Sequence, residues 1–253
     1  MSLEVIESPK LEVFSLNTCH SGRQYGLFQD ILDFIYREKP HVVLLQEVYQ
    51  GSLERIRNAL GGEIVFSRMY SLSLTDRKED AEAWGVAIGS RYNLHDIREN
   101  YYHGTEENST DIVLNNGPQS TSSLLQAGLE VGSARFNFGT THFTWVRGAE
   151  PSKQQLEDFR KLEVLLDRAP DLILTGDFNS PRGYPIFDSI AKRYRDNIPP
   201  GAETTIDTVV RPEATWKYVI DGFFTSEHYG VKNVRMVQGL SDHQGILGEV
   251  QKV

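Results

Sequence analysis

The fold is decided by the stretch Leu172-Ile173-Leu174-Thr175-Gly176-Asp177-Phe178-Asn179. Its mostly apolar first half predicts a β-strand that is buried in the protein. Two polar side chains, Asp177 and Asn179, end this strand, and buried polar groups need partners that satisfy them. In layered α/β proteins, strand ends are the places where loops converge on a ligand. The stretch therefore predicts a functional site at the end of a buried strand.

The same pattern, an apolar strand that ends in an oxygen donor or an imidazole, recurs along the chain. The segment 41–47 is a continuous apolar run whose polar residues come only at its end, which is typical of a strand buried on both faces. The residues at such strand ends are Asn17, Glu47, His142, Asp177 with Asn179, Asp221, and Asp242 with His243. Residues that are distant in sequence can meet at strand ends. We expect these side chains to form one pocket.

Short strand-like runs alternate with amphipathic helical stretches, with no repeat and no linker. The pattern predicts strands at 11–17, 41–47, 64–67, 85–89, 124–130, 134–143, 171–177, 218–225 and 245–250, and helices at 25–38 and 152–167. It predicts loops at 101–121 and 199–214. Strands grouped in pairs and separated by helices favour an α/β fold of two packed sheets with helices outside. We expect a single domain that spans residues 1–253.

The charge of the chain bears on its partners. The formal net charge is −9, whereas nonspecific affinity for nucleic acid comes mostly from Lys and Arg. Nucleic acid is therefore possible but disfavoured as a substrate. A locally basic cleft would reverse this preference, and the residues that would build one near Asn179 are Arg182, Lys192, Arg193 and Arg195.

Composition also bounds the compartment. The single cysteine, Cys19, excludes an intrachain disulfide framework and a cysteine-built zinc site. No apolar stretch is long enough to cross a bilayer as a helix. The first ten residues carry Glu4 and Glu7 and lack a basic segment followed by an apolar run, so they do not match the pattern of a secretory signal. We expect a cytoplasmic protein, with a leader trimmed from the chain as the open alternative.

The side-chain chemistry at the strand ends indicates a hydrolase. Carboxylate and amide oxygens suit Mg²⁺, Mn²⁺ or Ca²⁺, whereas a tetrahedral zinc site needs histidine or cysteine sets that the sequence lacks. Carboxylates and two histidines around such a cation suit phosphoester hydrolysis. Neither glycine-rich nucleotide-binding signature occurs, and the serine-hydrolase Gly-x-Ser-x-Gly motif is absent.

These motifs together resemble the endonuclease/exonuclease/phosphatase superfamily of metal-dependent hydrolases. The resemblance runs in order across nearly the whole chain, through Leu16-Asn17, Leu45-Gln46-Glu47, Thr141-His142-Phe143, Gly176-Asp177-Phe178-Asn179, Ile220-Asp221-Gly222-Phe223-Phe224 and Ser241-Asp242-His243. It implies a four-layer α/β sandwich, in which two mixed β-sheets pack face to face with helices outside. It also implies a Mg²⁺ or Mn²⁺ cofactor.

The resemblance further implies a role for each matched residue. Glu47 would be the principal metal ligand, and Asn17 and Asp242 would contribute directly or through water. Asp177 and Asn179 would orient the attacking water. His243, oriented by Asp221, would be the general base or stabilise charge on the phosphoryl group. His142 would protonate the leaving oxygen or bind the phosphate.

Several positions stay open. The candidates for a central phosphate contact are Tyr101, Tyr102, Arg91, Arg98 and Arg147, and those for a partner of His142 are Glu82 and Glu79. Arg182 is equally well placed for a substrate phosphate or for the surface, and Trp145 is a candidate substrate contact. The other histidines, His20, His41, His95, His103 and His228, are expected to be structural or solvated. Cys19 is expected to be a small buried residue and not a nucleophile.

Three functions remain. The first is a phosphodiesterase or phosphatase of a small or lipid-derived substrate, which the acidic charge favours. The second is a DNA or RNA nuclease on the same scaffold. The third is a noncatalytic binding module, which the complete set of polar residues disfavours. The natural substrate, the choice between mono- and diester, the number of metal ions and the oligomeric state are open.

Overall fold

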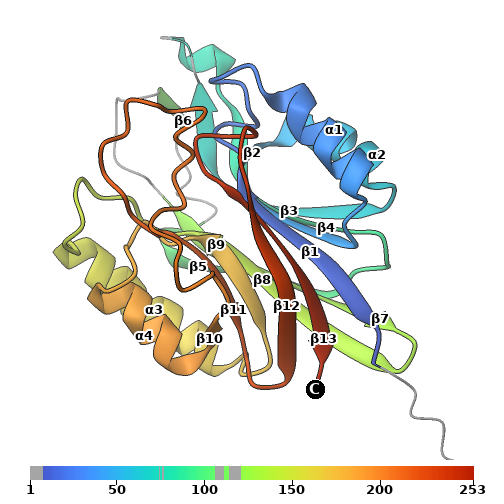
Figure 1. Ribbon diagram of the computed structural model, residues 1–253. Coiled ribbons are helices and arrows are strands. Elements are labelled where there is room, and N and C mark those ends of the chain that lie inside the picture. Colours follow the sequence, from blue (N-terminus) through green and yellow to red (C-terminus); the bar gives the residue numbers. More distant parts are fainter. Residues whose placement is uncertain (1–7, 74, 76, 106–110, 114–120) are drawn as a thin grey trace, which may run out of the picture.

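The computed structural model describes residues 8–73, 75, 77–105, 111–113 and 121–253. Two mixed β-sheets pack face to face, and helices cover their outer faces (Figure 1). The helices α1 (Phe28–Glu38) and α2 (Leu53–Leu60) lie outside one sheet, and α3 (Lys153–Asp167) and α4 (Pro185–Arg193) lie outside the other. The expected four-layer sandwich is confirmed. None of the helices in the described ranges has the length and apolar character needed to span a membrane.

The two sheets contain all the strands of the described residues. The first sheet runs in the order β12 (Tyr229–Val237), β13 (Gly245–Lys252), β1 (Lys10–Asn17), β2 (Val42–Tyr49), β4 (Glu82–Ser90), β3 (Glu63–Ser73) and β6 (Asp111–Val113). The second runs in the order β10 (Arg195–Asp196), β11 (Asp221–Thr225), β9 (Ile173–Asp177), β8 (Ala134–His142), β7 (Ser122–Val131) and β5 (His95–His103). Short 3₁₀ turns lie at Gln50–Ser52 and Lys78–Asp80.

The central strands explain why the sheets are covered on both faces. Along β2, Val42 and Leu44 pack into the interior of the sandwich, whereas Val43 and Leu45 pack toward α1 and α2. Successive side chains of a strand point to opposite faces, so a continuous apolar run needs cover on both sides. Helix α1 supplies part of that cover through the buried residues Ile31, Leu32, Phe34 and Ile35.

The structure corrects several expected boundaries. The loop expected at 101–121 is wrong in part, because β5 continues to His103 and β6 occupies Asp111–Val113; residues 106–110 and 114–120 lie outside the described ranges. Strand β5 is a largely exposed edge strand without apolar alternation, so the strand-period signal was missing. The strand expected at 218–225 begins only at Asp221. The loop expected at 199–214 is confirmed, since no helix or strand forms there.

Strand register brings the motifs together. Strands β8 and β9 run parallel and place His142 beside Asp177, while β9 and β11 run antiparallel and place Asp221 on its other side. In the first sheet, the parallel pair β1 and β2 places Asn17 beside Gln46, the residue before Glu47. Both parallel pairs therefore end at the same edge of the sandwich.

Candidate active site

Glu47 enters the site through a distortion of its strand. The pairing of β2 with β4 shifts register between Leu45 and Val48, and the backbone of Glu47 is left-handed with φ of 59°. Such a conformation costs a residue with a side chain about 1–2 kcal/mol, and a β-bulge re-aims the side chain that it contains. The bulge turns Glu47 toward the strand ends, where its side chain is 16% exposed.

Asn17 connects the two sheets. Its amide nitrogen donates to Oε1 of Glu47 at 3.1 Å and to Oδ2 of Asp177 at 3.0 Å. Its amide oxygen accepts a hydrogen bond from the backbone N–H of Cys19 at 3.0 Å. Asn17 therefore holds the two carboxylates, one from each sheet, against a single amide group.

Asp177 and Asn179 form a tight turn after β9. The backbone N–H of Asn179 donates to Oδ1 of Asp177 at 2.8 Å, and the side chain of Asn179 donates to the carbonyl of Phe143 at 2.9 Å. Asn179 adopts a left-handed backbone with φ of 46°, which asparagine tolerates better than most residues. The turn fixes both polar groups at the end of the buried strand.

His142 faces the same carboxylates. Its Nε2 lies 3.5 Å from Oε1 of Glu47, 3.6 Å from Oδ2 of Asp177 and 3.3 Å from the amide nitrogen of Asn179. Within the described residues, its buried Nδ1 has no hydrogen-bond partner. The expected acidic partners do not reach it, because Glu82 binds Arg23 and the backbone of Gly51, and Glu79 pairs with Arg77.

His243 and Asp221 form a buried pair. Nδ1 of His243 lies 2.9 Å from Oδ2 of Asp221, and Nε2 lies 3.8 Å from Oδ2 of Asp177. Asp221 therefore orients the ring so that Nε2 faces the site. Burial alone lowers the pKa of His243, but the carboxylates of Asp221 and Asp177 outweigh it and hold that pKa well above its usual value. Burial raises the pKa of Asp177, and the charge of Asp221 adds to this effect.

Asp242 lies at the margin of this group. Its carboxylate is 3.6 Å from Arg211 and accepts a hydrogen bond from the Ser241 hydroxyl at 3.3 Å. Burial raises the pKa of the neighbouring Cys19 thiol, and the charges of Glu47 and Asp242 raise it further. A thiol with a raised pKa stays neutral, as expected for a cysteine that is not a nucleophile. The metal-binding roles of Asn17, Glu47 and Asp242 stay predictions.

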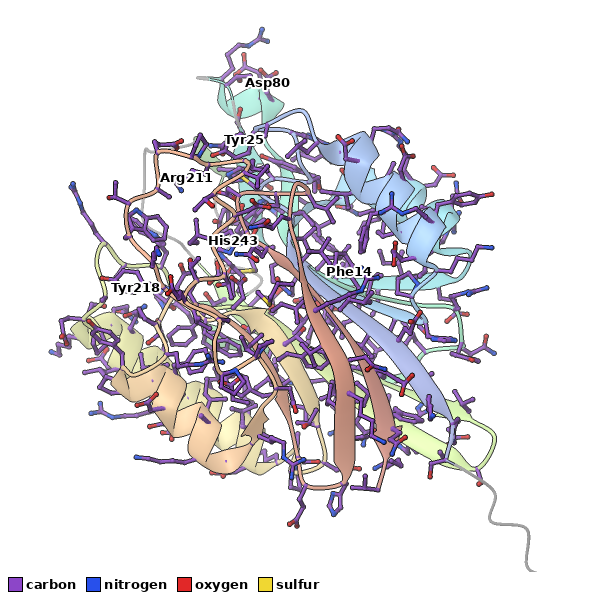
Figure 2. All side chains as sticks on the ribbon, viewed as in Figure 1. Phe14, Tyr25, Asp80, Arg211, Tyr218 and His243 are labelled. Atoms are coloured by element: carbon purple, nitrogen blue, oxygen red, sulfur yellow. The ribbon has the colours of Figure 1, made fainter. Side chains whose placement is uncertain are left out.

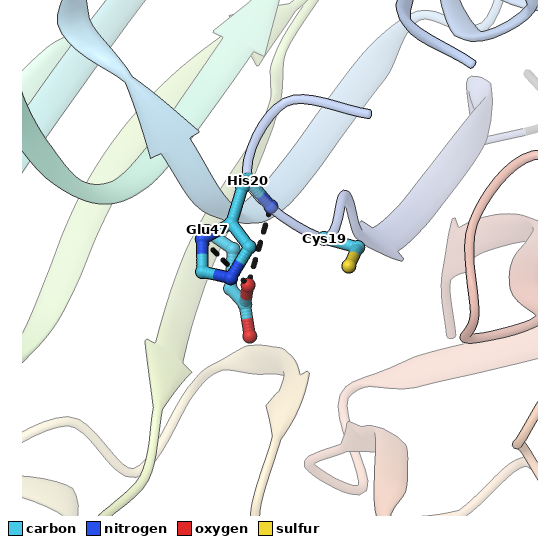
Figure 3. Close-up of side chains that lie close together, drawn as sticks. All are labelled: Cys19, His20 and Glu47. Atoms are coloured by element: carbon cyan, nitrogen blue, oxygen red, sulfur yellow. Dashed lines mark hydrogen bonds and ion pairs between the residues drawn. The ribbon is translucent and has the colours of Figure 1, made fainter. Parts of the chain in front are cut away.

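His20 is a site residue that sequence reasoning missed. It was expected to be structural or solvated, but its backbone N–H donates to Oε2 of Glu47 at 3.2 Å, and its Nδ1 lies 3.4 Å from the same oxygen (Figure 3). Its Nδ1 also accepts a hydrogen bond from the indole N–H of Trp84 at 3.2 Å. Three successive left-handed residues, Cys19, His20 and Ser21, curl this loop over Glu47. The only sequence signal was the position of His20, three residues after Asn17.

The candidates for a phosphate contact differ in their partners and in their distance from the site. Arg91 binds the carbonyl of Lys39, and Arg182 pairs with Asp196 at 2.7 Å. The hydroxyl groups of two tyrosines are hydrogen-bonded within the protein. Tyr101 donates to the Arg68 carbonyl, and Tyr102 bonds the Thr141 hydroxyl. Arg98 lies in a pocket with Arg135 and Arg168, among residues none of which belongs to the site. Arg147 lines a cavity that also contains Asn179.

Gln155 is a second residue that sequence reasoning missed. It is buried in the first turn of α3, and its amide nitrogen donates to the carbonyl of Thr144 at 2.7 Å and to that of Asn179 at 3.1 Å. Ser152 caps this helix, and the side chain of Gln155 completes the capping box. The helix therefore holds the loop after His142 and the turn after Asp177 through one side chain.

Replacing Gln155 with leucine is expected to lower kcat about tenfold, because the two loops lose the group that positions them and small misplacements at a site are costly. We expect KM to change little. The measurement is steady-state kinetics on a chromogenic phosphoester with a thermal melt. Gln154→Leu is the matched control, since Gln154 bonds Asp158 and His103 but neither loop. An equal fall of kcat in both variants would refute the positioning role.

The donor atoms at the site fit a hard divalent cation. Ligand atoms of Cys19, His20 and Glu47 lie within 4.8 Å of one another, as do those of Asp177, Asp221 and His243. The Asn17 amide and the His142 imidazole both contact the carboxylates of Glu47 and Asp177, and carboxylate oxygens suit Mg²⁺ or Mn²⁺. Among the described residues, the carboxylate of Glu47 contacts the groups of Asn17, His20 and His142.

Solved structures share this fold at low sequence identity. An endonuclease/exonuclease/phosphatase from Bacteroides vulgatus is 16% identical, with a TM-score of 0.72 over 97% of this chain and 100% of that chain. A mannosyl-6-phosphatase from Bacteroides thetaiotaomicron is 18% identical, with a TM-score of 0.66 over 95% and 99%. TDP2 from D. rerio, complexed with a single-strand DNA product, is 15% identical, with a TM-score of 0.68 over 96% and 99%. No curated protein matches the chain in sequence.

The fold and the site together define a hydrolase of phosphoester bonds. The sequence profile of the Endonuclease/Exonuclease/phosphatase family matches residues 15–243, which include every strand-end residue described above. The chain belongs to this family. Its solved neighbours include both a phosphatase and a DNA-bound enzyme, so the substrate has to be argued from the residues of this chain.

Proposed function

We propose that the chain is a single-domain, cytoplasmic phosphodiesterase or phosphatase of a small phosphoester that uses Mg²⁺ or Mn²⁺. The observation that supports this most is the surroundings of Oδ2 of Asp177. This oxygen lies 3.0 Å from the amide of Asn17, 3.6 Å from Nε2 of His142 and 3.8 Å from Nε2 of His243. One carboxylate oxygen thus lies between two imidazoles, in reach of groups that can move protons on either side of a phosphoryl centre.

The proposed roles are those that the family resemblance implies for these residues. Glu47 would hold the cation, with Asn17 and Asp242 beside it, and the bound cation would neutralise charge on the phosphoryl oxygens. Asp177 and Asn179 orient the attacking water. His243, fixed by Asp221, is the general base or stabilises charge on the phosphoryl group. His142 protonates the leaving oxygen or binds the phosphate.

The alternative, a nuclease, is weakened by the pairing of the candidate basic residues. Arg182 is neutralised by Asp196, and Arg193 is neutralised by Asp167 at 2.5 Å. The net charge of −9 then stands without a local basic cleft built from Arg182 and Arg193. A polyanionic strand would approach against the field of the protein. A small phosphoester carries less charge and meets less repulsion.

A metal-dependent assay tests the proposed function. We expect hydrolysis of bis-p-nitrophenyl phosphate or p-nitrophenyl phosphate with Mg²⁺ or Mn²⁺, complete loss in EDTA, and recovery when the cation is restored. Single- and double-stranded DNA and RNA are the comparison substrates. Cleavage of nucleic acid with no activity on the small esters would favour the nuclease. Inactivity on all of them would favour the binding module.

Cation binding can be measured apart from turnover. Replacing Glu47 with glutamine keeps the size of the side chain and removes its charge, so we expect Mn²⁺ affinity to fall at least about tenfold by isothermal titration calorimetry. Glu54→Gln is the matched control, because Glu54 is an exposed residue of α2. Equal Mn²⁺ affinity in the wild type and the Glu47 variant would contradict the assignment of the main ligand.

A further inference from the structure

A cavity of about 540 Å³ opens next to the candidate active site. The loop after β8, the turn after β9 and the segment before β11 all line it, and its lining residues include Trp145, Arg147, Asn179, Arg211, Trp216 and Tyr218. Figure 2 shows Arg211 and Tyr218 on the segment before β11, at the same end of the molecule as His243. Because Asn179 belongs to both the site and the cavity, the cavity is continuous with the site.

Aromatic side chains form much of its wall. Trp145 is 63% exposed and Trp216 is 39% exposed, although most large aromatics in this protein are buried. The ring of Trp216 lies 6.2 Å from that of Tyr218, and the guanidinium of Arg211 lies 5.5 Å from the centre of the Trp216 ring. Flat side chains held in this way offer stacking surfaces for a flat ligand.

The charged groups of the cavity are hydrogen-bond donors. Arg147 and Arg211 are its charged residues, and neither aspartate nor glutamate occurs among the lining residues that the structure describes. Arg211 is held by Asp242 at 3.6 Å and by Glu213 at 3.3 Å. Across the described ranges, no carboxylate lies within 4.0 Å of Arg147. The guanidinium of Arg147 repels a quaternary ammonium group, although aromatic faces attract one, so the walls disfavour a choline head group.

We propose that this aromatic cavity binds the organic group of the substrate, and that this group is a planar ring rich in hydrogen-bond acceptors, of the kind found in a nucleoside. The ring stacks on Trp145 or Trp216, and Arg147 donates to its acceptor atoms or to a second phosphate. This inference rests on the proposed function, because that function places the reacting phosphate beside Asn179. The inference adds the chemical identity of the organic group attached to the phosphate.

The size of the cavity limits the ligand to one such unit. Pockets for small molecules usually measure about 300–1,000 Å³, and 540 Å³ lies in the lower half of that range. Proteins that track a single strand combine a long basic groove with several stacking platforms. This cavity offers one cluster of aromatic residues, which suits a mononucleotide-sized phosphoester better than a polymer.

Calorimetry with ligands that cannot be hydrolysed tests this inference independently of turnover. The ligands are phosphonate analogues of adenosine 5′-monophosphate, ribose 5-phosphate and phosphocholine, titrated into the protein with Mg²⁺. We expect the adenosine analogue to bind at least about tenfold more tightly than the ribose analogue, since stacking on one aromatic side chain contributes an effect of this order. Equal affinities, or tighter binding of the choline analogue, would overturn the proposal.

Single substitutions test which tryptophan the ring of the ligand stacks on. The variant that removes the stacking partner, Trp145→Ala or Trp216→Ala, is expected to remove most of the preference for adenosine, with the ribose analogue unchanged, and Trp145→Phe is expected to retain it. Tyr36→Ala is the control, because Tyr36 is a 69% exposed aromatic residue of α1. An equal loss for both ligands would contradict ring recognition. If the adenosine preference holds while no phosphoester is hydrolysed, the cavity assignment stands and the proposed function fails.

Discussion

Replacing His243 with alanine is expected to lower kcat by about 10²- to 10⁴-fold, the range that a positioned acid or base contributes. The imidazole is oriented by Asp221 at 2.9 Å and presents Nε2 toward Asp177 at 3.8 Å. The measurement is steady-state kinetics on bis-p-nitrophenyl phosphate at saturating Mg²⁺, together with a circular dichroism spectrum to confirm the fold.

Two further variants separate the chemical role from a structural one. Asp221→Asn keeps the size of the side chain but removes the charge that orients the ring, so we expect a smaller fall than for His243→Ala. His228→Ala is the matched control, because His228 is half exposed and pairs with Asp171 away from the site. Turnover near that of the wild type in His243→Ala would eliminate the assigned role.

Replacing Gly176 with alanine is expected to destabilise the protein by about 3 kcal/mol or more, because overpacking and backbone strain each cost about 1–3 kcal/mol. Gly176 has φ of 151°, and a Cβ at this position would lie 2.1 Å from the carbonyl oxygen of Thr141 on the neighbouring strand β8. The collision would push β9 from β8 where His142 and Asp177 lie side by side. Urea denaturation measures the loss of stability.

Gly132→Ala is a reference variant in which a left-handed residue gains a side chain without a collision. Gly132 has φ of 61°, and a Cβ there would meet nothing within 4 Å. Its replacement therefore carries only the cost of a left-handed residue, about 1 kcal/mol. If the two variants lose the same stability, contact with Thr141 is not what requires glycine in the motif.

The sequence predicted the centre of the fold better than its edges. Buried strands such as β2 and β9 carry a continuous apolar signal that ends in polar residues, and both the strands and their convergence were predictable. Strand β5 and the helices α2 and α4 were not. Helix α2 is eight residues long with two buried side chains, so its periodic signal is short, and the Pro185 that begins α4 was a start signal that went unused.

Within the site, the residues at strand ends were predictable, whereas the side chains that hold them were not. His20 reaches Glu47 through three left-handed residues, a loop conformation that has no pattern in the sequence. Gln155 is one glutamine among several on an amphipathic helix, and its contacts with two loops depend on how the helix docks. The cavity beside Asn179 brings together residues from three loops, which only the assembled fold makes neighbours.

The bridge formed by Asn17 has a consequence for folding. The site is divided between the sheets, since Glu47 comes from one and Asp177 from the other, and a second hydrogen bond crosses nearby from Gln46 to Thr140 at 2.8 Å. Neither sheet alone holds a working set of groups. A state that keeps its secondary structure but lets the layers separate would be inactive. Catalytic activity therefore measures whether the two sheets are packed together. Inhibitors that contact both sheets would raise the melting temperature of the protein.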